Sequence, residues 1–419
     1  MRVKRLLSSA LSLLLVGIVV PGFAFESQAA PASGLHAADW RTAQDLIEDI
    51  TVGWNLGNTL DAHPDGFTVG NHSRETWTVE EQETLWGNPV TTKAMIRAIR
   101  DSGFNAIRIP VTWYPMLDSD FQVRADWMDR VQRVVDYAYN DGMIVILNTH
   151  HDESLINLGR ATGVTTSNSQ RFVTRIWSQI SDRFATYNHR LIFECFSEPR
   201  TMGSPYEWTG GTATERANLN KLNQLCVDTI RANGHGYNST RFLMVPTYAA
   251  AVNEVALRGW KMPTDPAGPN RLIVSLHAYV PWRFAADASA SRANCPEGCR
   301  RWSASGTGSQ NGVGEIISAL NLARNRFPNY PIILGEMAAL NRGNNASRVA
   351  WAQYYNKLAT SLGMRVFWWD NGQFAVQQVN GPDNFAIFDR RTLSWPFPTL
   401  VRALLNSVKP TTNPAWGTM

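Results

Sequence analysis

The chain has 419 residues, of which 44% are hydrophobic, and it carries a net charge of +4. A chain of this length holds either one large α/β barrel or two to three smaller domains. The small net charge excludes strong electrostatic steering of nucleic acids or acidic polymers, so we expect no nucleic-acid partner.

The first 30 residues have the pattern of a secretion signal. Arg2, Lys4 and Arg5 precede an apolar run at residues 11–20, and small residues near Ala30 offer cleavage sites. We therefore expect residues 1–30 to be removed and residues 31–419 to form a secreted or periplasmic domain. An uncleaved membrane anchor is the alternative. No other segment has the roughly 18 continuous apolar residues of a membrane span, so we expect no membrane contact in the mature form. We also expect the mature form to be a monomer.

Four cysteines in an exported chain suggest disulfide bonds. Cys295 and Cys299 flank a short segment with Pro and Gly, which predicts a local disulfide between them. Cys195 lies in an apolar run and Cys226 in a helical stretch, and both are predicted to be buried thiols. No His stands at ligand spacing around the Cys295–Cys299 pair, so no metal site is expected.

Eight apolar runs, separated mostly by stretches of helical periodicity, predict the fold. The runs are rich in Ile, Val, Leu and Phe, as strands buried on both faces are. They lie at residues 52–56, 106–111, 144–148, 191–196, 242–246, 272–276, 332–334 and 366–368, and the helical stretches at 92–102, 127–141, 169–187, 214–232, 312–326 and 347–362. Strand–helix alternation predicts a parallel sheet, and eight repeats predict a (β/α)8 TIM barrel as a single catalytic domain.

An open, doubly wound sheet is the alternative fold. It often carries a glycine-rich phosphate loop that opens a helix after the first strand. The segment at residues 53–58 (GWNLGN) lies within a predicted strand instead, so it is a weak match to a dinucleotide fingerprint. We expect no organic cofactor.

Polar and aromatic side chains collect where the predicted strands end. In a barrel of parallel strands these ends meet at one face, where active sites are built. The residues are Asn55 in the end of the first run, Arg108 in the second with Trp113 beyond it, His150 and His151 after the third, Ser197 and Glu198 after the fourth, His277 and Tyr279 after the sixth, Glu336 after the seventh and Trp369 after the eighth.

Glu198 and Glu336 are the central pair in this set. Two carboxylates that face one bond are what the hydrolysis of a glycosidic bond requires. We expect Glu336 to act as nucleophile, kept ionised by Arg108 and Tyr279, and Glu198 to act as acid/base. Because Glu336 is negative and close, we expect a raised pKa for Glu198.

The remaining residues have expected supporting roles. His150 and His277 would bind sugar hydroxyls or orient the carboxylates, and Trp369, or else Trp368, would form the floor under the sugar. Arg108 could also pair with Glu194 inside the barrel, and the role of His151 stays open. About half of the loop tryptophans are expected to be sugar platforms and the rest to pack loops; these are Trp86, Trp113, Trp208, Trp260, Trp282 and Trp302.

Together these residues resemble glycoside hydrolase family 5, the retaining β-glycanases. The similarity spans residues 46–405, with the motifs GWNLGNTLDA at 53–62, LWGNP at 85–89, NAIRIPVTW at 105–113, NTHHD at 148–152, HAY at 277–279, GEM at 335–337 and FWWDNG at 367–372. The resemblance implies endo-β-1,4-glucanase activity on cellulose, mixed-linkage glucan or xyloglucan. It implies no metal and no organic cofactor.

One position departs from the family pattern. The acid/base Glu of the family follows an Asn that binds the hydroxyl next to the anomeric carbon, and Ser197 stands there in this chain. Ser is shorter and has one donor, so an uncompensated loss would cost about 2–4 kcal/mol in the transition state. We predict that the site compensates. The alternatives are an endo-β-mannanase of the same fold and a catalytically impaired carbohydrate-binding protein.

Overall fold

The computed structural model describes residues 40–64, 77–159, 167–289, 299–305 and 312–407. Residues 33–419 group into one compact unit. The predicted secretion signal, residues 1–30, lies outside the described residues. Within the described ranges, no helix combines the length and apolar character needed to cross a membrane.

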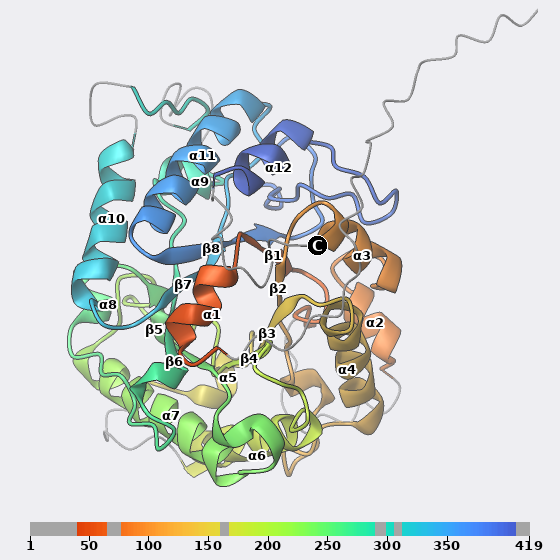
Figure 1. Cartoon of the computed structure of the whole chain (residues 1–419), viewed down its shortest axis with the longest axis vertical. Coiled ribbons are helices and arrows are strands. Elements are labelled where there is room, and N and C mark those ends of the chain that lie inside the picture. The colour runs from red at the N-terminus through yellow and green to blue at the C-terminus, as the bar shows by residue number, and fades with distance from the viewer. Residues whose placement is uncertain (1–39, 65–76, 160–166, 290–298, 306–311, 408–419) are drawn as a thin grey trace, which may run out of the picture. The chain divides into compact units, whose positions relative to one another are not determined.

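Eight parallel strands form a closed barrel in the described part of the chain (Figure 1). The barrel closes because β1 pairs in parallel with both β2 and β8. The strands are β1 (Gly53–Leu56), β2 (Ala106–Ile109), β3 (Ile144–Asn148), β4 (Leu191–Glu194), β5 (Leu243–Ala251), β6 (Leu272–His277), β7 (Ile332–Met337) and β8 (Met364–Asp370). The predicted (β/α)8 barrel is therefore confirmed, and the open sheet is excluded.

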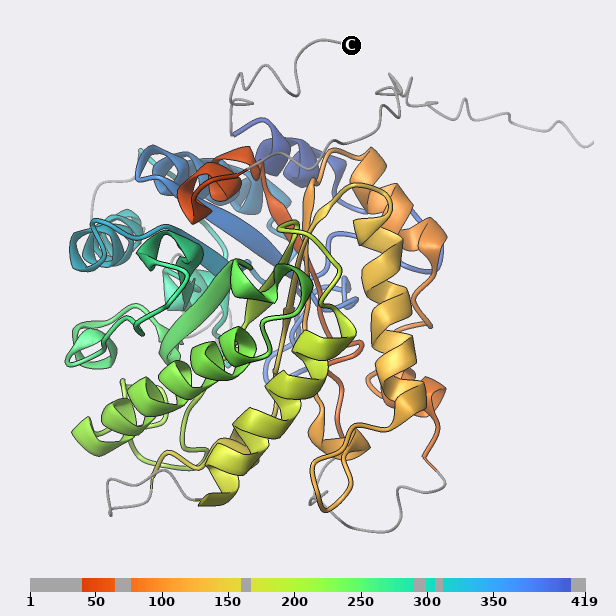
Figure 2. The same ribbon diagram turned by 60° about the horizontal axis from the view of Figure 1, so that its bottom comes forward.

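Helices surround the barrel, as Figures 1 and 2 show. The six predicted stretches correspond to α3 (Lys93–Asp101), α4 (Ala125–Tyr139), α6 (Ser167–Arg183), α7 (Ala213–Ala232), α10 (Val313–Arg326) and α11 (Asn345–Ser361). Shorter helices were not predicted: α1 (Ala43–Asp49), α2 (Val79–Thr84), α5 (Glu153–Ile156), α8 (Glu254–Leu257), α9 (Trp282–Ala285) and α12 (Pro398–Leu405).

Local signals set the helix ends. Thr212 caps α7, because its hydroxyl accepts from the Glu215 backbone N–H while the Glu215 carboxylate accepts from the Thr212 N–H. Gly103, just after α3, has φ of +110°, a conformation that an L side chain would strain. Strand β4 ends at Glu194 rather than near residue 196, so Glu198 lies in the loop beyond the strand.

The barrel interior is apolar near the N-terminal ends of the strands, which we call the lower end. Helix α1 packs against inward-facing strand residues at this end, with Leu46 and Ile47 in one buried cluster with Ile146 and Phe367. Gly53 makes room for this layer, because a Cβ there would lie 2.1 Å from the Phe367 ring. Polar side chains therefore gather at the other end, where the C-terminal ends of the strands meet, which we call the upper end.

The predicted cysteine pattern is partly wrong. Cys195 and Cys226, predicted to be thiols, form a disulfide that ties the segment after β4 to α7. Their Cα atoms lie 6.1 Å apart because α7 packs beside the barrel at this level. Cys299 is also disulfide-bonded, whereas Cys295, its predicted partner, lies outside the described residues.

Candidate active site

Arg108 lies at the centre of the upper end of the barrel. It is fully buried on β2, and strand register places it beside Asn55 of β1. Its Nε donates to Glu194 over 2.7 Å, and its Nη1 donates to Glu336 over 2.8 Å. Burial alone would lower the pKa of Arg108, but the charges of the two carboxylates raise it above its usual value. One permanent cation therefore serves both carboxylates, as the sequence analysis had allowed.

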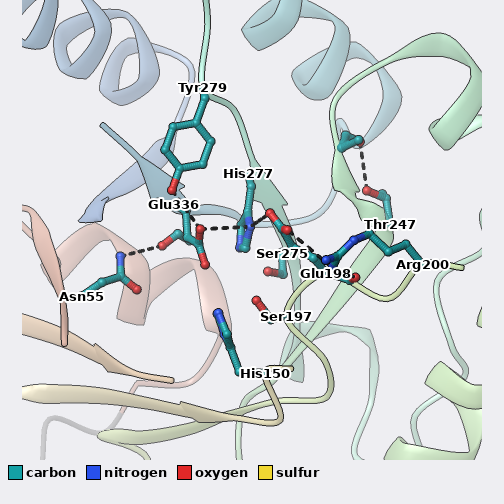
Figure 3. A network of polar contacts seen from close by, with 12 residues as sticks. Asn55, His150, Ser197, Glu198, Arg200, Thr247, Ser275, His277, Tyr279 and Glu336 are labelled. Carbon is teal, nitrogen blue, oxygen red and sulfur yellow. Dashed lines mark hydrogen bonds and ion pairs between the residues drawn. The ribbon is translucent and has the colours of Figure 1, made fainter. Parts of the chain in front are cut away.

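Glu336 is held from three sides. Besides Arg108, the Tyr279 hydroxyl donates to its Oε2 over 2.9 Å, and His277 Nδ1 lies 3.6 Å from the same oxygen. Asn55 supports the strand, because its amide donates to the Gly335 carbonyl over 2.9 Å. Figure 3 shows Tyr279 and His277 converging on Glu336. These contacts fix the position of the Glu336 carboxylate.

Glu198 faces Glu336 across the imidazole of His277. Glu198 Oε1 lies 2.8 Å from His277 Nδ1, and the Glu198 side chain is 22% exposed, against 7% for Glu336. Oxygen atoms of the two carboxylates lie within 4.8 Å of each other (Figure 3). This close approach fits the carboxyl separation of about 5–5.5 Å in retaining glycosidases better than the roughly 6.5–9.5 Å of inverting enzymes, which admit a water between the carboxyls.

The expected raised pKa of Glu198 is wrong. Burial raises the pKa of Glu198, but the hydrogen bond and charge of His277, together with Arg200 and His151, lower it below its usual value. The pKa of His277 changes in the opposite direction: burial lowers it, while Glu336 and Glu198 raise it above 6.5. The expectation rests on repulsion from Glu336 alone, whereas these cations decide the direction of the pKa shift. Glu198 and His277 thus share one proton.

Arg200 is a residue of the site that the sequence patterns do not predict. It follows Glu198 by two residues, and its Nη1 donates to the Glu198 carbonyl over 2.9 Å and lies 3.8 Å from Glu198 Oε2. Glu153 and Glu207 bind the same guanidinium over 2.5 and 3.0 Å. A basic residue two positions after a candidate acid/base was the available signal. The position of Arg200 depends on tertiary contacts, because its partner Glu153 lies in α5 and its partner Glu207 lies in the β4–α7 loop.

Comparisons with known proteins agree with this geometry. The family described as Cellulase (glycosyl hydrolase family 5) matches residues 65–375. The chain belongs to this family. The prediction of a family 5, cellulase-like glycoside hydrolase is thereby confirmed.

Two curated relatives and one solved structure illustrate the match. The cellulase/esterase CelE of Acetivibrio thermocellus is 39% identical over 89% of this chain, and this chain spans only 42% of CelE. Endoglucanase A of Clostridium longisporum is 38% identical over 90% of this chain and 68% of its own length. A broad-specificity endoglucanase of Ruminococcus champanellensis, solved with bound cellotriose, is 36% identical with a TM-score of 0.76, covering 87% of this chain and 98% of that one.

Ser197 replaces the Asn expected in this glycosyl hydrolase. Its hydroxyl oxygen accepts from Arg108 Nη2 over 2.9 Å, which leaves the hydroxyl hydrogen available to a ligand. His150 lies nearby in Figure 3. Burial and the neighbouring cations, His151 first, lower the pKa of His150 well below its usual value, so the ring is neutral. Asn148 Nδ2 lies 3.4 Å from His150 Nδ1, which assigns the proton to Nε2.

Trp369 and Trp368, the two candidates for the floor under the sugar, differ in their exposure. Trp369 lies parallel to the His150 ring, with centroids 5.6 Å apart, and is 8% exposed. A Cβ on Gly57 would lie 2.8 Å from the Trp369 ring, so glycine there permits this position. Trp368 is fully buried and donates to the Phe385 carbonyl, which excludes it as the sugar floor.

Trp113 does not suit its predicted role in substrate binding. It is fully buried, and its indole N–H donates to the Asn148 carbonyl over 3.0 Å, so it packs the core below the site. Trp260 and Trp302 are likewise buried. Trp86, Trp208 and Trp282 are the loop tryptophans of the predicted set that retain exposed surface.

His151 lies at the edge of the site. Its side chain is 28% exposed, its Nδ1 lies 3.9 Å from Glu153, and its ring is 5.7 Å from the Trp86 ring. Burial lowers the pKa of His151, but the hydrogen bond and charge of Glu153 raise it above its usual value. His151 is thus placed to contact a ligand beside Trp86 rather than to bind Glu198 or Glu336.

Two groups of side chains have spacing that suits a cation: Glu198, His277 and Glu336, and Asp61, His150 and His151. In the first group, the contacts with Arg108 and Tyr279 described above already engage Glu336. In the second, Asp61 accepts from the Asn58 and Thr59 backbone N–H groups. These contacts hold the Glu336 and Asp61 carboxylates in place.

Proposed function

We propose that this protein is a retaining endo-β-1,4-glucanase that cleaves internal bonds of cellulose, mixed-linkage glucan or xyloglucan. The observation that carries the proposal is the separation of Glu198 and Glu336, whose oxygens lie within 4.8 Å. Their environments divide the two roles. Glu336 is held by a permanent cation and a hydroxyl donor, whereas Glu198 is bonded to a titratable imidazole.

In the first step, a Glu336 oxygen forms a bond to the anomeric carbon while the bond from that carbon to the leaving oxygen breaks. The proton shared by Glu198 and His277 moves to the leaving oxygen through Glu198. Negative charge is lost at Glu336 as the ester forms. The negative charge of Glu336 raises the pKa of His277. Because this charge is lost in the first step, His277 holds its proton less strongly at the moment when Glu198 must donate a proton.

In the second step, a water oxygen attacks the anomeric carbon and the bond to Glu336 breaks. Glu198, now a carboxylate, accepts the proton of the water. The returning charge of Glu336 is again stabilised by Arg108 and Tyr279. The cycle restores the Glu336 carboxylate and the proton of the Glu198–His277 pair, and it gives net retention at the anomeric carbon.

The names of the relatives support glucan as the substrate. Endoglucanase A of Clostridium longisporum matches across most of both chains, and the Ruminococcus champanellensis enzyme binds cellotriose, a β-glucan fragment. Ser197 is the feature that keeps β-mannan as a second candidate, because mannose differs from glucose at the hydroxyl that this residue would face. We infer that neutral His150, with its Nε2–H donor, supports Ser197 in binding that hydroxyl.

The test is reducing-sugar release by residues 31–419 on carboxymethylcellulose, xyloglucan and β-mannan. Release from a glucan that is lost in both E198A and E336A supports the proposal. Azide should restore turnover of an activated aryl glycoside to E336A with inverted product, because the small anion replaces the nucleophile. Release from mannan alone moves the substrate to mannan. Binding without turnover in folded wild-type protein overturns the enzymatic proposal.

We also propose that the protein is exported. The Cys195–Cys226 disulfide and the disulfide-bonded Cys299 support this, because disulfides persist in oxidising compartments and are rare in the cytosol. Fractionation of cells expressing the full chain, with mass analysis of the mature N-terminus, tests it. Full-length protein retained in the cytosol would contradict export.

A further inference from the structure

Trp208 is a large apolar side chain that the fold leaves exposed beside the catalytic residues. It lies in the loop between β4 and α7, ten residues after Glu198, and is 59% exposed. Isolated exposed apolar residues need no explanation. Trp208 differs because its ring is held by a charged residue that also contacts the acid/base.

That residue is Arg200, whose guanidinium carbon lies 4.4 Å from the centre of the Trp208 ring. The guanidinium is itself fixed by Glu153, Glu207 and the Glu198 carbonyl. One face of the indole is thus covered by a guanidinium that cannot move freely. Since most of the ring remains exposed, the opposite face is available to a ligand.

We propose that Trp208 and Arg200 form a subsite for a glucosyl unit on the leaving-group side of the cleaved bond. This inference rests on the proposed glucanase function. Trp208 would stack on the flat apolar face of the sugar. Arg200 would hold the indole in position and offer its Nη2, which has no hydrogen-bond partner among the described residues, to a sugar hydroxyl.

The direction of the substrate follows from the chemistry of Glu198. The leaving oxygen must lie within hydrogen-bond distance of this acid, so the sugars that depart continue from Glu198 away from Trp369 and His150. Arg200 is the next side chain outward, with its Nη1 3.8 Å from Glu198 Oε2. Figure 3 shows Arg200 on the side of Glu198 opposite to Glu336.

The chemistry of the surface suits a neutral sugar rather than a charged group. Glu153 and Glu207 neutralise Arg200, so an anionic ligand gains little from its charge. A rigid aromatic platform binds a flat ligand with little loss of conformational freedom. Stacking on Trp208 also draws the leaving group towards Glu198, which would aid proton transfer as well as binding.

The test compares two substrates that differ on the leaving-group side. Cellopentaose places glucosyl units there, whereas 4-nitrophenyl β-cellobioside places only a phenol. We expect W208A to lower the ratio of kcat/KM for cellopentaose to kcat/KM for the aryl substrate about tenfold, which is about 1.4 kcal/mol. W208F, which keeps an aromatic ring, should retain most of the ratio.

Two control variants sharpen the result. Tyr237 is an exposed aromatic residue that precedes β5 at the opposite end of the barrel, so Y237A should leave the ratio unchanged. Trp282, 58% exposed in α9 after β6, tests the competing path of the sugar chain. A fall in the ratio for W282A with none for W208A would overturn the proposal. Equal loss on both substrates in W208A would also overturn it.

The same experiment separates this inference from the proposed function. Wild-type turnover of both substrates, with an unchanged ratio in W208A, refutes the subsite while leaving the glucanase intact. Wild-type protein that turns over neither substrate refutes the glucanase and the subsite together. Melting temperatures within about 2 °C of wild type exclude unfolding as the cause, since surface substitutions cost little stability.

Discussion

Substituting Arg108 by Met tests the electrostatic centre of the site. Arg108 and Glu194 are both fully buried, and the Glu336 side chain is 7% exposed. Removing the cation leaves Glu194 buried without a counter-charge and Glu336 with only the titratable His277 beside it, which costs about 3–5 kcal/mol. For a domain of this size, the melting temperature at pH 7 should fall by about 4–6 °C.

The loss should depend on pH. In R108M the folded protein binds protons more readily than the unfolded chain, because protonation removes an uncompensated buried charge. Stability of the variant therefore rises as pH falls, and one proton taken up between pH 7 and pH 5 returns about 2–3 kcal/mol. The destabilisation relative to wild type should be clearly smaller at pH 5 than at pH 7.

R241M is the matched control. Arg241 is also fully buried, but its partners are the Asn238 amide oxygen and backbone carbonyls of the α6–β4 connection. Burial lowers the pKa of Arg241 to about 9, so it stays charged at both pH values. R241M should be destabilised without that pH dependence. Urea denaturation at pH 5 and pH 7 measures both variants. Equal losses for R108M at the two pH values would refute the reasoning.

Three further predictions concern the acid/base and its surroundings. S197N should change kcat/KM on carboxymethylcellulose by less than about threefold, because one compensated donor is exchanged for another; a rise of about a hundredfold, the scale of one donor, would contradict compensation. H277Q should move the alkaline limb of the pH profile of kcat/KM to lower pH. The reason is that the raised pKa of His277 keeps the proton on the Glu198–His277 pair. An alkaline limb at the wild-type pH would exclude the shared proton. C226S should lose about 3 kcal/mol in urea denaturation, since the Cys195–Cys226 bond closes a loop with sequence separation 31; unchanged stability would show that the bond constrains little.

Several features could be predicted because they depend on local pattern and on one rule of topology. Buried strand runs alternating with helices imply a parallel barrel, and parallel strand ends meet at one face. Asn55, Arg108 and Glu336 therefore had to lie together, although they are far apart in the chain. The hydrogen bonds from Arg108 and Tyr279 to Glu336 bear this out.

The tertiary structure decided what depends on contacts between distant side chains. The Cys195–Cys226 pairing follows from where α7 packs against the segment after β4, which no sequence spacing encodes. The lowered pKa of Glu198 follows from His277, which the sequence placed near the site without its distance, and from Arg200, which the sequence patterns did not predict. Burial likewise separated Trp113, which packs the core, from Trp208, which stays exposed. Periodicity and strand-end chemistry are properties of the chain, whereas proton affinity, disulfide pairing and exposure depend on the atoms that folding brings around each group.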